Sequence, residues 1–360
     1  MSSAPPPSPP APLRWSPLRI IFLLLGGLLF ALLVRRVGVQ NLFQQDVGIG
    51  WSFAAIVLLF GGVHFLRSLT WRACLGEDGH RIPFRTLFAL WLGGEAVSAL
   101  SFAWSGEAFR AAATVKTLSL ARGVSAQLVT RVLYTYASGV WITAGFLLVW
   151  RVVEVRGAVE KMMLTGTLVS VGLLLAATAA LMAPERVLAP FVRWEERRYQ
   201  RWPRPWRRRF LRFLHVLEED VARTVGTRRQ LLILLGQNVL AALAGVLEVY
   251  LILRGLGMPV SLSAAIVIEG LNKVLGLFAY VVPGNLGVRE GGNVLILQLF
   301  GLTAVTGVNL VLIRRVRAMV WVGLGVLLLI RHGISPLAMT RSQDPAGPVT
   351  HVSKEALPPR

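Results

Sequence analysis

Long runs of apolar residues, separated by short polar segments, extend along most of the chain. Most of these runs provide the roughly 20 helical residues that cross a bilayer core of about 30 Å. The alternation of apolar and polar residues that a β-barrel requires is absent, so the pattern predicts an all-α membrane fold. The eight candidate spans are Ile20–Val34, Val47–Leu66, Thr86–Gly106, Ser125–Trp150, Met162–Met182, Leu231–Leu253, Leu262–Val282 and Thr303–Ile330.

Composition favours the same class of protein. Of the 360 residues, 54% are hydrophobic and only 16% are charged, and few soluble folds bury so much apolar side chain behind so little charged surface. The 38 basic and 18 acidic residues give a formal net charge of +20, which we interpret first as a signal of topology and anionic lipid. The single cysteine, Cys74, excludes an intramolecular disulfide framework and a Cys-rich metal site.

Two tails flank the predicted membrane domain. Residues 1–16 are rich in Pro, Ser and Ala and have little to bury, so they predict a disordered segment, as do the polar residues 333–360. Residues 17–332 form the predicted integral membrane domain. It includes the first apolar run because two arginines, and no small-residue cleavage site, follow that run.

Basic residues predict that two loops lie in the cytoplasm. The segment 183–230 holds 13 Arg against 6 acidic residues, and Arg67, Arg72, Arg81 and Arg85 mark the loop after the second run. Three full crossings between these loops would place them on opposite sides of the membrane. One of the three intervening runs should therefore not cross.

The weakest of the three runs is Thr86–Gly106, which contains Gly93, Gly94 and Glu95. Polar residues and helix breakers are tolerated at membrane depth where they line a cavity, as in re-entrant or broken helices. Leu262–Phe300 has the same character, with two apolar arms around a Pro-Gly turn. With both segments as re-entrant hairpins, about six full spans remain, both termini are cytoplasmic, and the hairpins enter from opposite faces, as in an inverted repeat.

Charged residues within the apolar runs are the candidates for function. Each costs about 2.5–3.5 kcal/mol at the membrane centre on insertion scales and usually faces a cavity or a partner. These residues are Glu95, Glu107, Arg110, Arg131, Glu248, Glu269, Lys273, Arg289, Glu290, Arg314, Arg315 and Arg317.

A first cluster is the sequence Ser105-Gly106-Glu107-Ala108-Phe109-Arg110, with Glu95 upstream. Glu107 and Arg110 are spaced i, i+3 and would share a helix face. Alone, the pattern fits a cavity-lining group and equally an ion pair at a helix start near the membrane interface.

A second cluster surrounds the segment Val282–Gly292, where four glycines and one proline break the helix and free backbone amides to bind an anion. Apolar residues on both sides favour a functional site over a surface turn. Its candidate site residues are Asn285, Arg289 and Glu290, preceded by Glu269 and Lys273 in the favourable i, i+4 order of acid and base.

Three arginines interrupt the last apolar run. Arg314 and Arg317 would share one helix face, while Arg315 would point elsewhere. Two arrangements stay open: an arginine that reaches the cavity, or a span that starts near Ala318 with all three arginines at the interface.

The cytoplasmic segment 184–230 predicts an amphipathic helix on anionic lipid. Seven arginines between Arg197 and Arg209 alternate with aromatic residues, and apolar residues at helical spacing follow. Each basic residue near such a surface contributes about 1 kcal/mol. A nucleic-acid partner is not expected, because the segment is tethered to a bilayer and contains no recognisable binding module.

The clustered residues give the chain a family resemblance. Ser105–Arg110, Thr130-Arg131 and the Pro-Gly-x-x-Gly-x-Arg-Glu element at 283–290 resemble the flippase-like family, also called the lysylphosphatidylglycerol synthase transmembrane region. An arginine at 314 or 317 also resembles one of the family. The resemblance covers most of the chain and implies movement of a lipid between leaflets. The soluble aminoacyltransferase domain of the lysyl-lipid synthases is not expected here.

The preferred hypothesis is a lipid transporter in the inner (cytoplasmic) cell membrane. Arginines 110, 131 and 289 would hold a phosphate, and glutamates 95, 107 and 290 would pair with them in the empty site. No Walker A motif occurs, so ATP is not the expected direct energy source, and no metal or cofactor is predicted. A membrane enzyme acting on lipid head groups and a membrane scaffold stay open as alternatives. The oligomeric state, a homo-oligomer included, also stays open.

Overall fold

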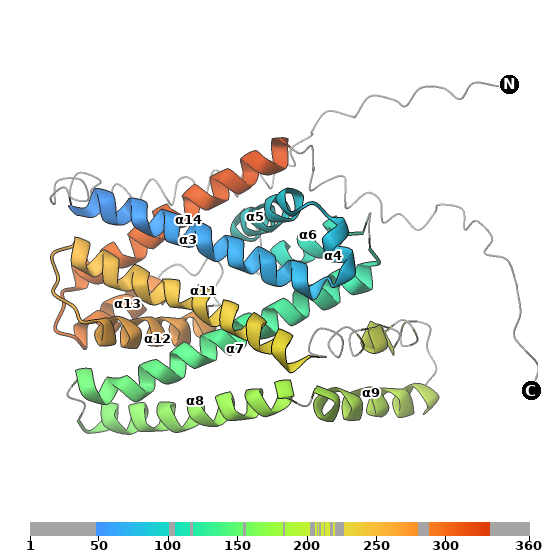
Figure 1. The fold of residues 1–360 in the computed structure, drawn as a ribbon. Coiled ribbons are helices and arrows are strands. Elements are labelled where there is room, and N and C mark those ends of the chain that lie inside the picture. The colour runs from blue at the N-terminus through green and yellow to red at the C-terminus, as the bar shows by residue number, and fades with distance from the viewer. Residues whose placement is uncertain are drawn as a thin grey trace, which may run out of the picture.

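The computed structural model describes residues 48–100, 105–115, 118–153, 156–182, 184–201, 227–279 and 288–331, with single residues and short pieces between 206 and 219. The predicted first span and both predicted tails lie outside the described residues. Within the described ranges the regular secondary structure is helical, which confirms the all-α class (Figure 1).

The helices are α3 (Gly48–Cys74), α4 (Glu77–Arg81), α5 (Phe84–Leu100), α6 (Ser105–Ala113), α7 (Leu120–Val152), α8 (Ala158–Met182), α9 (Pro184–Arg201), α11 (Arg228–Gly255), α12 (Leu262–Ala279), α13 (Val288–Gln298) and α14 (Ala304–Arg331). Ser119 and Thr227 begin α7 and α11 as N-caps, because their hydroxyls accept hydrogen bonds from the backbone amides of the third residue on. Among the described residues, four helices are long and apolar enough to cross a membrane: Gly50–Cys74, Leu120–Val152, Ala158–Met182 and Arg228–Gly255.

Helix α14 has 28 residues and is long enough to cross, since 1.5 Å per residue gives about 42 Å. Three arginines in its middle lower its apolar character. The helix is continuous through all three, so they belong to its middle and not to its start.

Two helical hairpins occupy the predicted positions. In the first, the 17-residue α5 is followed by the 9-residue α6, and in the second the 18-residue α12 is followed by the 11-residue α13. Every arm is shorter than the roughly 20 residues of a full span. The first hairpin extends to Ala113, so the Ser105–Arg110 sequence forms its short second arm.

The hairpins enter the bundle from opposite ends. Helices α3 and α11 are antiparallel, because Thr70 near the end of α3 contacts Asn238 of α11, whereas Ile56 near its start packs near Ile252. The α5–α6 hairpin follows the end of α3 and the α12–α13 hairpin follows the end of α11, at the other side of the bundle (Figure 1). The hairpins therefore have the opposite orientations that the predicted inverted repeat requires.

The first half of the bundle (α3–α7) and the second half (α11–α14) pack on each other through equivalent helices. Helix α5 of the first half packs on α14 of the second, and α12 packs on α7. Glycines permit both contacts: a Cβ on Gly270 would lie 3.0 Å from the Trp141 carbonyl oxygen of α7, and one on Gly325 of α14 would overlap the Leu92 carbonyl oxygen of α5. Close approach through small residues is typical of membrane helix packing.

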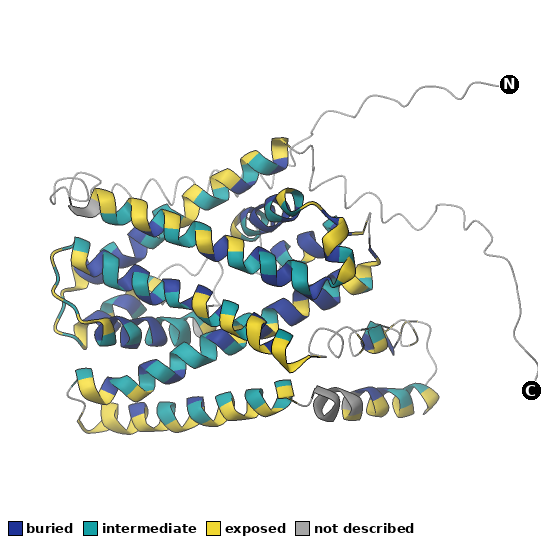
Figure 2. Cartoon of the chain, in the orientation of Figure 1, coloured by how far each residue is buried: buried dark blue, intermediate teal, exposed yellow. Residues whose placement is uncertain are grey.

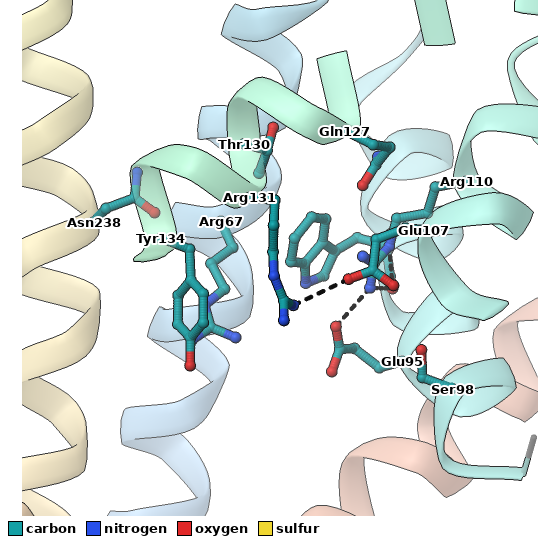
Figure 3. A pocket seen from close by; sticks show the side chains of 11 residues that line it. Arg67, Glu95, Ser98, Glu107, Arg110, Gln127, Thr130, Arg131, Tyr134 and Asn238 are labelled. Atoms are coloured by element: carbon teal, nitrogen blue, oxygen red, sulfur yellow. Dashed lines mark hydrogen bonds and ion pairs between the residues drawn. The ribbon is translucent and has the colours of Figure 1, made fainter. Parts of the chain in front are cut away.

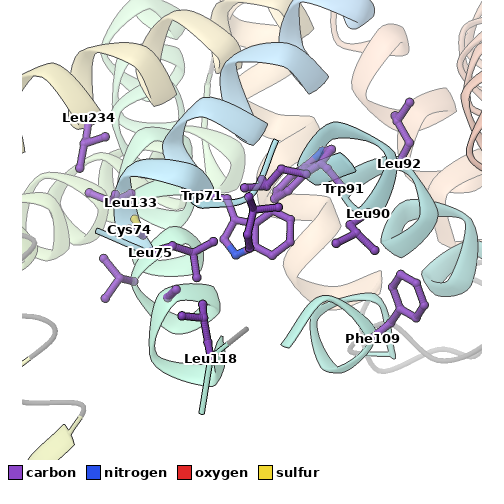
Figure 4. Packing of buried hydrophobic residues seen from close by; sticks show 14 of the residues in the cluster. Trp71, Cys74, Leu75, Leu90, Trp91, Leu92, Phe109, Leu118, Leu133 and Leu234 are labelled. Atoms are coloured by element: carbon purple, nitrogen blue, oxygen red, sulfur yellow. The ribbon is translucent and has the colours of Figure 1, made fainter. Parts of the chain in front are cut away.

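Each hairpin has its own hydrophobic core. Trp71 and Trp91 lie at the centre of one core, with Leu133 of α7 and Leu234 of α11 (Figure 4). The other core joins α11–α14 to Ile56 of α3. Helix α8 lies at the edge of the bundle with much of its apolar surface exposed (Figure 2), as expected for a helix that faces lipid.

The helix α3 corrects one prediction from the charge pattern. It continues to Cys74, past the predicted span end at Leu66, so Arg67 and Arg72 lie in the helix and not in a loop. In this added part of the helix, the Arg72 Nε donates to the carbonyl of Gly79, 3.1 Å away, and Arg67 stacks on an aromatic ring of α7. Helices α4 and α9 lie at the same end of the bundle, as the topology argument requires (Figure 1).

Candidate functional site

A polar cavity of about 240 Å³ lies beside the first hairpin, between helices that are otherwise mostly apolar. Figure 3 shows Arg67 and Tyr134 on one side, Glu95 and Arg110 on the other, and Arg131 between them. We call Arg67, Glu95, Glu107, Arg110 and Arg131 the cavity cluster. The remaining lining residues are Trp91, Ser98, Gln127, Thr130, Tyr134 and Asn238.

Arg110 is the most deeply buried member of the cavity cluster, with 3% of its surface exposed. Its Nη2 lies 2.5 Å from Glu95 Oε1 and donates to the Trp91 carbonyl oxygen at 3.2 Å. The guanidinium also stacks on Trp91, with Cζ 3.8 Å from the ring centroid, where a cation–π attraction adds to the ion pair. Arg110 is therefore neutralised and held in one place.

The Ser-Gly pair before Glu107 allows the two arms of the hairpin to touch. A Cβ on Gly106 would overlap the Gly94 carbonyl oxygen, and the Gly106 amide donates to Ser98 Oγ at 3.0 Å. Ser105 Oγ donates to the Val97 carbonyl at 3.2 Å. A Cβ on Gly94 would in turn displace Arg110. These small residues thus place Arg110 against Glu95.

A second ion pair joins the short arm to α7. Arg131 Nη1 lies 3.2 Å from Glu107 Oε1, and both side chains are partly exposed to the cavity. The Glu107 Oε2 atom is buried without a hydrogen-bond partner among the described residues. Glu107 and Arg110 share the short arm, as predicted, but each pairs with a residue of a different helix.

Tyr134 carries two guanidinium groups near its ring. The Cζ atom of Arg67 lies 4.5 Å from the ring centroid and that of Arg131 lies 5.8 Å from it. Because an aromatic face attracts cations, Tyr134 holds both arginines at this side of the cavity.

The second predicted cluster forms a separate and closed network in the other half. Arg314 lies between two carboxylates, with Nε 3.0 Å from Glu248 and Nη2 2.6 Å from Glu269. Arg317 Nε lies 3.1 Å from Glu248, and Lys273 Nζ lies 3.3 Å from Glu269. We call these five residues the closed network. The predicted Glu269–Lys273 pair forms, and Arg314 and Arg317 share the predicted face.

A further ion pair joins Arg315 of α14 to Glu290 of α13. It repeats the Glu107–Arg131 pair at the same register. Each glutamate lies two residues after the first residue of its short arm, and each arginine lies eleven residues after the first residue of the next helix.

The structure brings Glu95, Glu107, Arg110 and Arg131 together at the cavity and places Glu269, Lys273, Arg314 and Arg317 in the closed network. Arg289 is exposed and is not among the cavity-lining residues, and its carbonyl accepts a hydrogen bond from Asn293. Asn285 lies outside the described residues.

Sequence reasoning missed two charged members of these sites. The pattern predicts a loop at Arg67 because this residue follows the apolar run directly, and it marks Glu248 as costly without placing it in a site. The signal for Arg67 was helical spacing, since His64, Arg67 and Thr70 continue one face of α3. Among the described residues, no group of three or more His, Cys, Asp or Glu side chains is placed to hold a metal ion.

Comparison with known protein families gives a match over most of the chain. The family model described as the lysylphosphatidylglycerol synthase transmembrane region matches residues 19–326, which include both hairpins and both ion-pair clusters. No curated protein and no solved structure matches the chain.

Proposed function

The chain belongs to the family of the lysylphosphatidylglycerol synthase transmembrane region, and we propose that it moves a polar-headed lipid between the two leaflets of a membrane. The observation that carries the proposal is a cavity with three arginines and two glutamates inside a bundle of membrane-spanning helices. Charges at this depth are costly and mark transport pathways in membrane proteins.

The size of the cavity fits a head group better than a whole lipid. Its volume of about 240 Å³ is below the roughly 300–1,000 Å³ of pockets for drug-sized ligands. The acyl chains would stay in the bilayer beside the exposed apolar faces of the helices. The opposite orientation of the two hairpins supports transport, because inverted repeats are typical of alternating-access transporters. The cavity itself lies beside the first hairpin, and its lining residues come from α3, α5, α6, α7 and α11.

The proposed setting is the inner cell membrane. The end of the bundle at which α4 and α9 lie would face the cytoplasm. Helix α9 is continuous over Pro184–Arg201, and Val192 of this helix packs with Leu211 and Leu214 of the segment that follows. Trp194 and Trp206 remain about half exposed. Exposed tryptophans beside many arginines support contact with an anionic lipid surface.

A leaflet-specific lipid assay in proteoliposomes tests the proposal. The unmodified protein should accelerate exchange of a labelled phospholipid, and Arg131→Gln should slow it by about tenfold or more, because a charge-assisted hydrogen bond contributes roughly 1.5–3 kcal/mol. Arg151→Gln is the matched control, since Arg151 is exposed at the end of the same helix. No exchange by the unmodified protein, or equal rates for the two variants, would contradict the proposal.

A further inference from the structure

The charges of the cavity cluster do not cancel. Three guanidinium groups face two carboxylates, and each carboxylate already has an arginine partner: Glu95 pairs with Arg110 and Glu107 with Arg131. No carboxylate of the described residues lies within 4.0 Å of the Arg67 guanidinium, whose described contact is the Tyr134 ring. One positive charge therefore remains at the Arg67 side of the cavity.

Arg67 is also short of hydrogen bonds. Its Nε is buried and has no hydrogen-bond partner among the described residues. A buried donor without a partner costs roughly 1–3 kcal/mol, and more when it is charged. A ligand that accepts hydrogen bonds would remove this cost, and guanidinium groups bind phosphate in a two-pronged geometry that suits them well.

Arg131 can contribute to the same ligand. Its guanidinium lies near the same Tyr134 ring as that of Arg67, and its ion pair with Glu107 is partly exposed to the cavity. Arg110 is unsuited to this role because Glu95, the Trp91 carbonyl and the Trp91 ring already surround it.

We propose that the cavity binds a singly charged phosphodiester between Arg67 and Arg131, and that Arg67 makes the site selective for anions. The inference rests on the proposed function and names its substrate class. A single negative charge balances the excess of one positive charge in the cavity cluster.

Binding to the purified full chain in detergent micelles tests the proposal without requiring transport. The probes are phosphatidylglycerol, the uncharged diacylglycerol with the same chains, and inorganic phosphate, and the measurement is native mass spectrometry with titration. Phosphatidylglycerol should bind at least tenfold more tightly than diacylglycerol. Arg67→Gln should weaken phosphatidylglycerol binding about tenfold, Arg67→Lys should restore part of it, and Arg151→Gln should change nothing.

A measurement on the unmodified protein guards against a folding defect in the variants. Labelling of Arg67 by phenylglyoxal, followed by peptide mass spectrometry, should fall several-fold when phosphatidylglycerol is added and stay constant with diacylglycerol. Competition by inorganic phosphate would show that the site recognises the phosphate alone. A lack of competition would show that it recognises the group within a lipid, and both results support the proposal.

Two outcomes would overturn the inference: equal binding of the charged and uncharged lipids, and phosphatidylglycerol binding that Arg67→Gln leaves unchanged while Arg67 labelling is unprotected. The proposed function fails separately. If binding depends on Arg67 but the protein moves no lipid in proteoliposomes, the anion site stands and the transport proposal is wrong.

Discussion

The two halves of the bundle share a frame but fill its polar centre differently. Each half joins its short hairpin arm to the next long helix by an ion pair at the same register, Glu107–Arg131 in one and Glu290–Arg315 in the other. In the first half, helix α3 carries Arg67 seven residues before its end. In the second half, helix α11 carries Glu248 at the corresponding position. This exchange of charge accompanies an open cavity in the first half and the closed network in the second.

The difference indicates a division of labour. Both clusters hold three bases and two acids, but in the closed network every base contacts an acid, and Glu248 alone contacts two arginines. In the cavity cluster one base has no acid, and space remains beside it. The closed network therefore suits a fixed contact between α11, α12 and α14, whereas the cavity cluster suits a ligand that comes and goes.

The largest expected effect comes from opening the closed network. Arg314→Met keeps the side-chain length but leaves Glu248 and Glu269 short of a cation, and breaking a buried pair costs about 3–5 kcal/mol. The free energy of unfolding in micelles, from denaturant titration, measures this loss. Arg331→Met at the exposed end of the same helix is the control and should stay within about 0.5 kcal/mol. Equal stability of the two variants would show that the network does not hold the helices together.

A smaller loss of stability should follow from separating the halves at their glycines. A Cβ on Gly325 would overlap a backbone carbonyl of α5, and one on Gly145 would lie 3.1 Å from Gly270 Cα of α12. Because overpacking costs about 1–3 kcal/mol, Gly325→Ala and Gly145→Ala should both lower the free energy of unfolding, Gly325→Ala the more.

The matched control for these variants is Gly323→Ala, since no other helix of the described residues has an atom within 4 Å of a Cβ at this position of α14. Its stability should be unchanged or slightly raised, because alanine favours helix over glycine by up to about 1 kcal/mol. If all three variants behave alike, the two helix contacts do not depend on close approach.

Charge counting and apolar run lengths were enough to predict the all-α class and the two short-armed hairpins. A cytoplasmic segment 183–230 required that one of the three preceding runs not cross the membrane. The structure has a short-armed hairpin, α5–α6, at the run that was expected not to cross. Polar residues among apolar ones also identified Glu107, Arg110 and Arg131 as costly. What could not be predicted is pairing between helices. Nothing in the sequence shows that Arg110 would choose Glu95 over Glu107, because that choice depends on the close contact at Gly94 and Gly106.

The boundary of α3 shows a second limit. An arginine after an apolar run normally marks the interface, and helical spacing continues the apolar helix past Arg67 without showing which of Arg67 and Arg72 faces a neighbouring helix. The structure separates them because Tyr134 comes from α7, 67 residues later in the chain, to stack on Arg67. Long-range contacts of this kind decide which arginine lines a site and which marks a membrane face.

The smallest expected effect tests whether the two ion pairs are equivalent. Double-mutant cycles with Glu107→Gln and Arg131→Gln, and with Glu290→Gln and Arg315→Gln, should each give a coupling of about 1 kcal/mol in unfolding free energy, as for partly exposed pairs. The cycles are then repeated with saturating phosphatidylglycerol. If a phosphodiester sits between Arg67 and Arg131, it competes with Glu107 for Arg131, so the first coupling should fall while the second stays constant. Equal changes in both couplings would mean that the lipid acts on the whole bundle and that the two halves do not differ in the way their charges suggest.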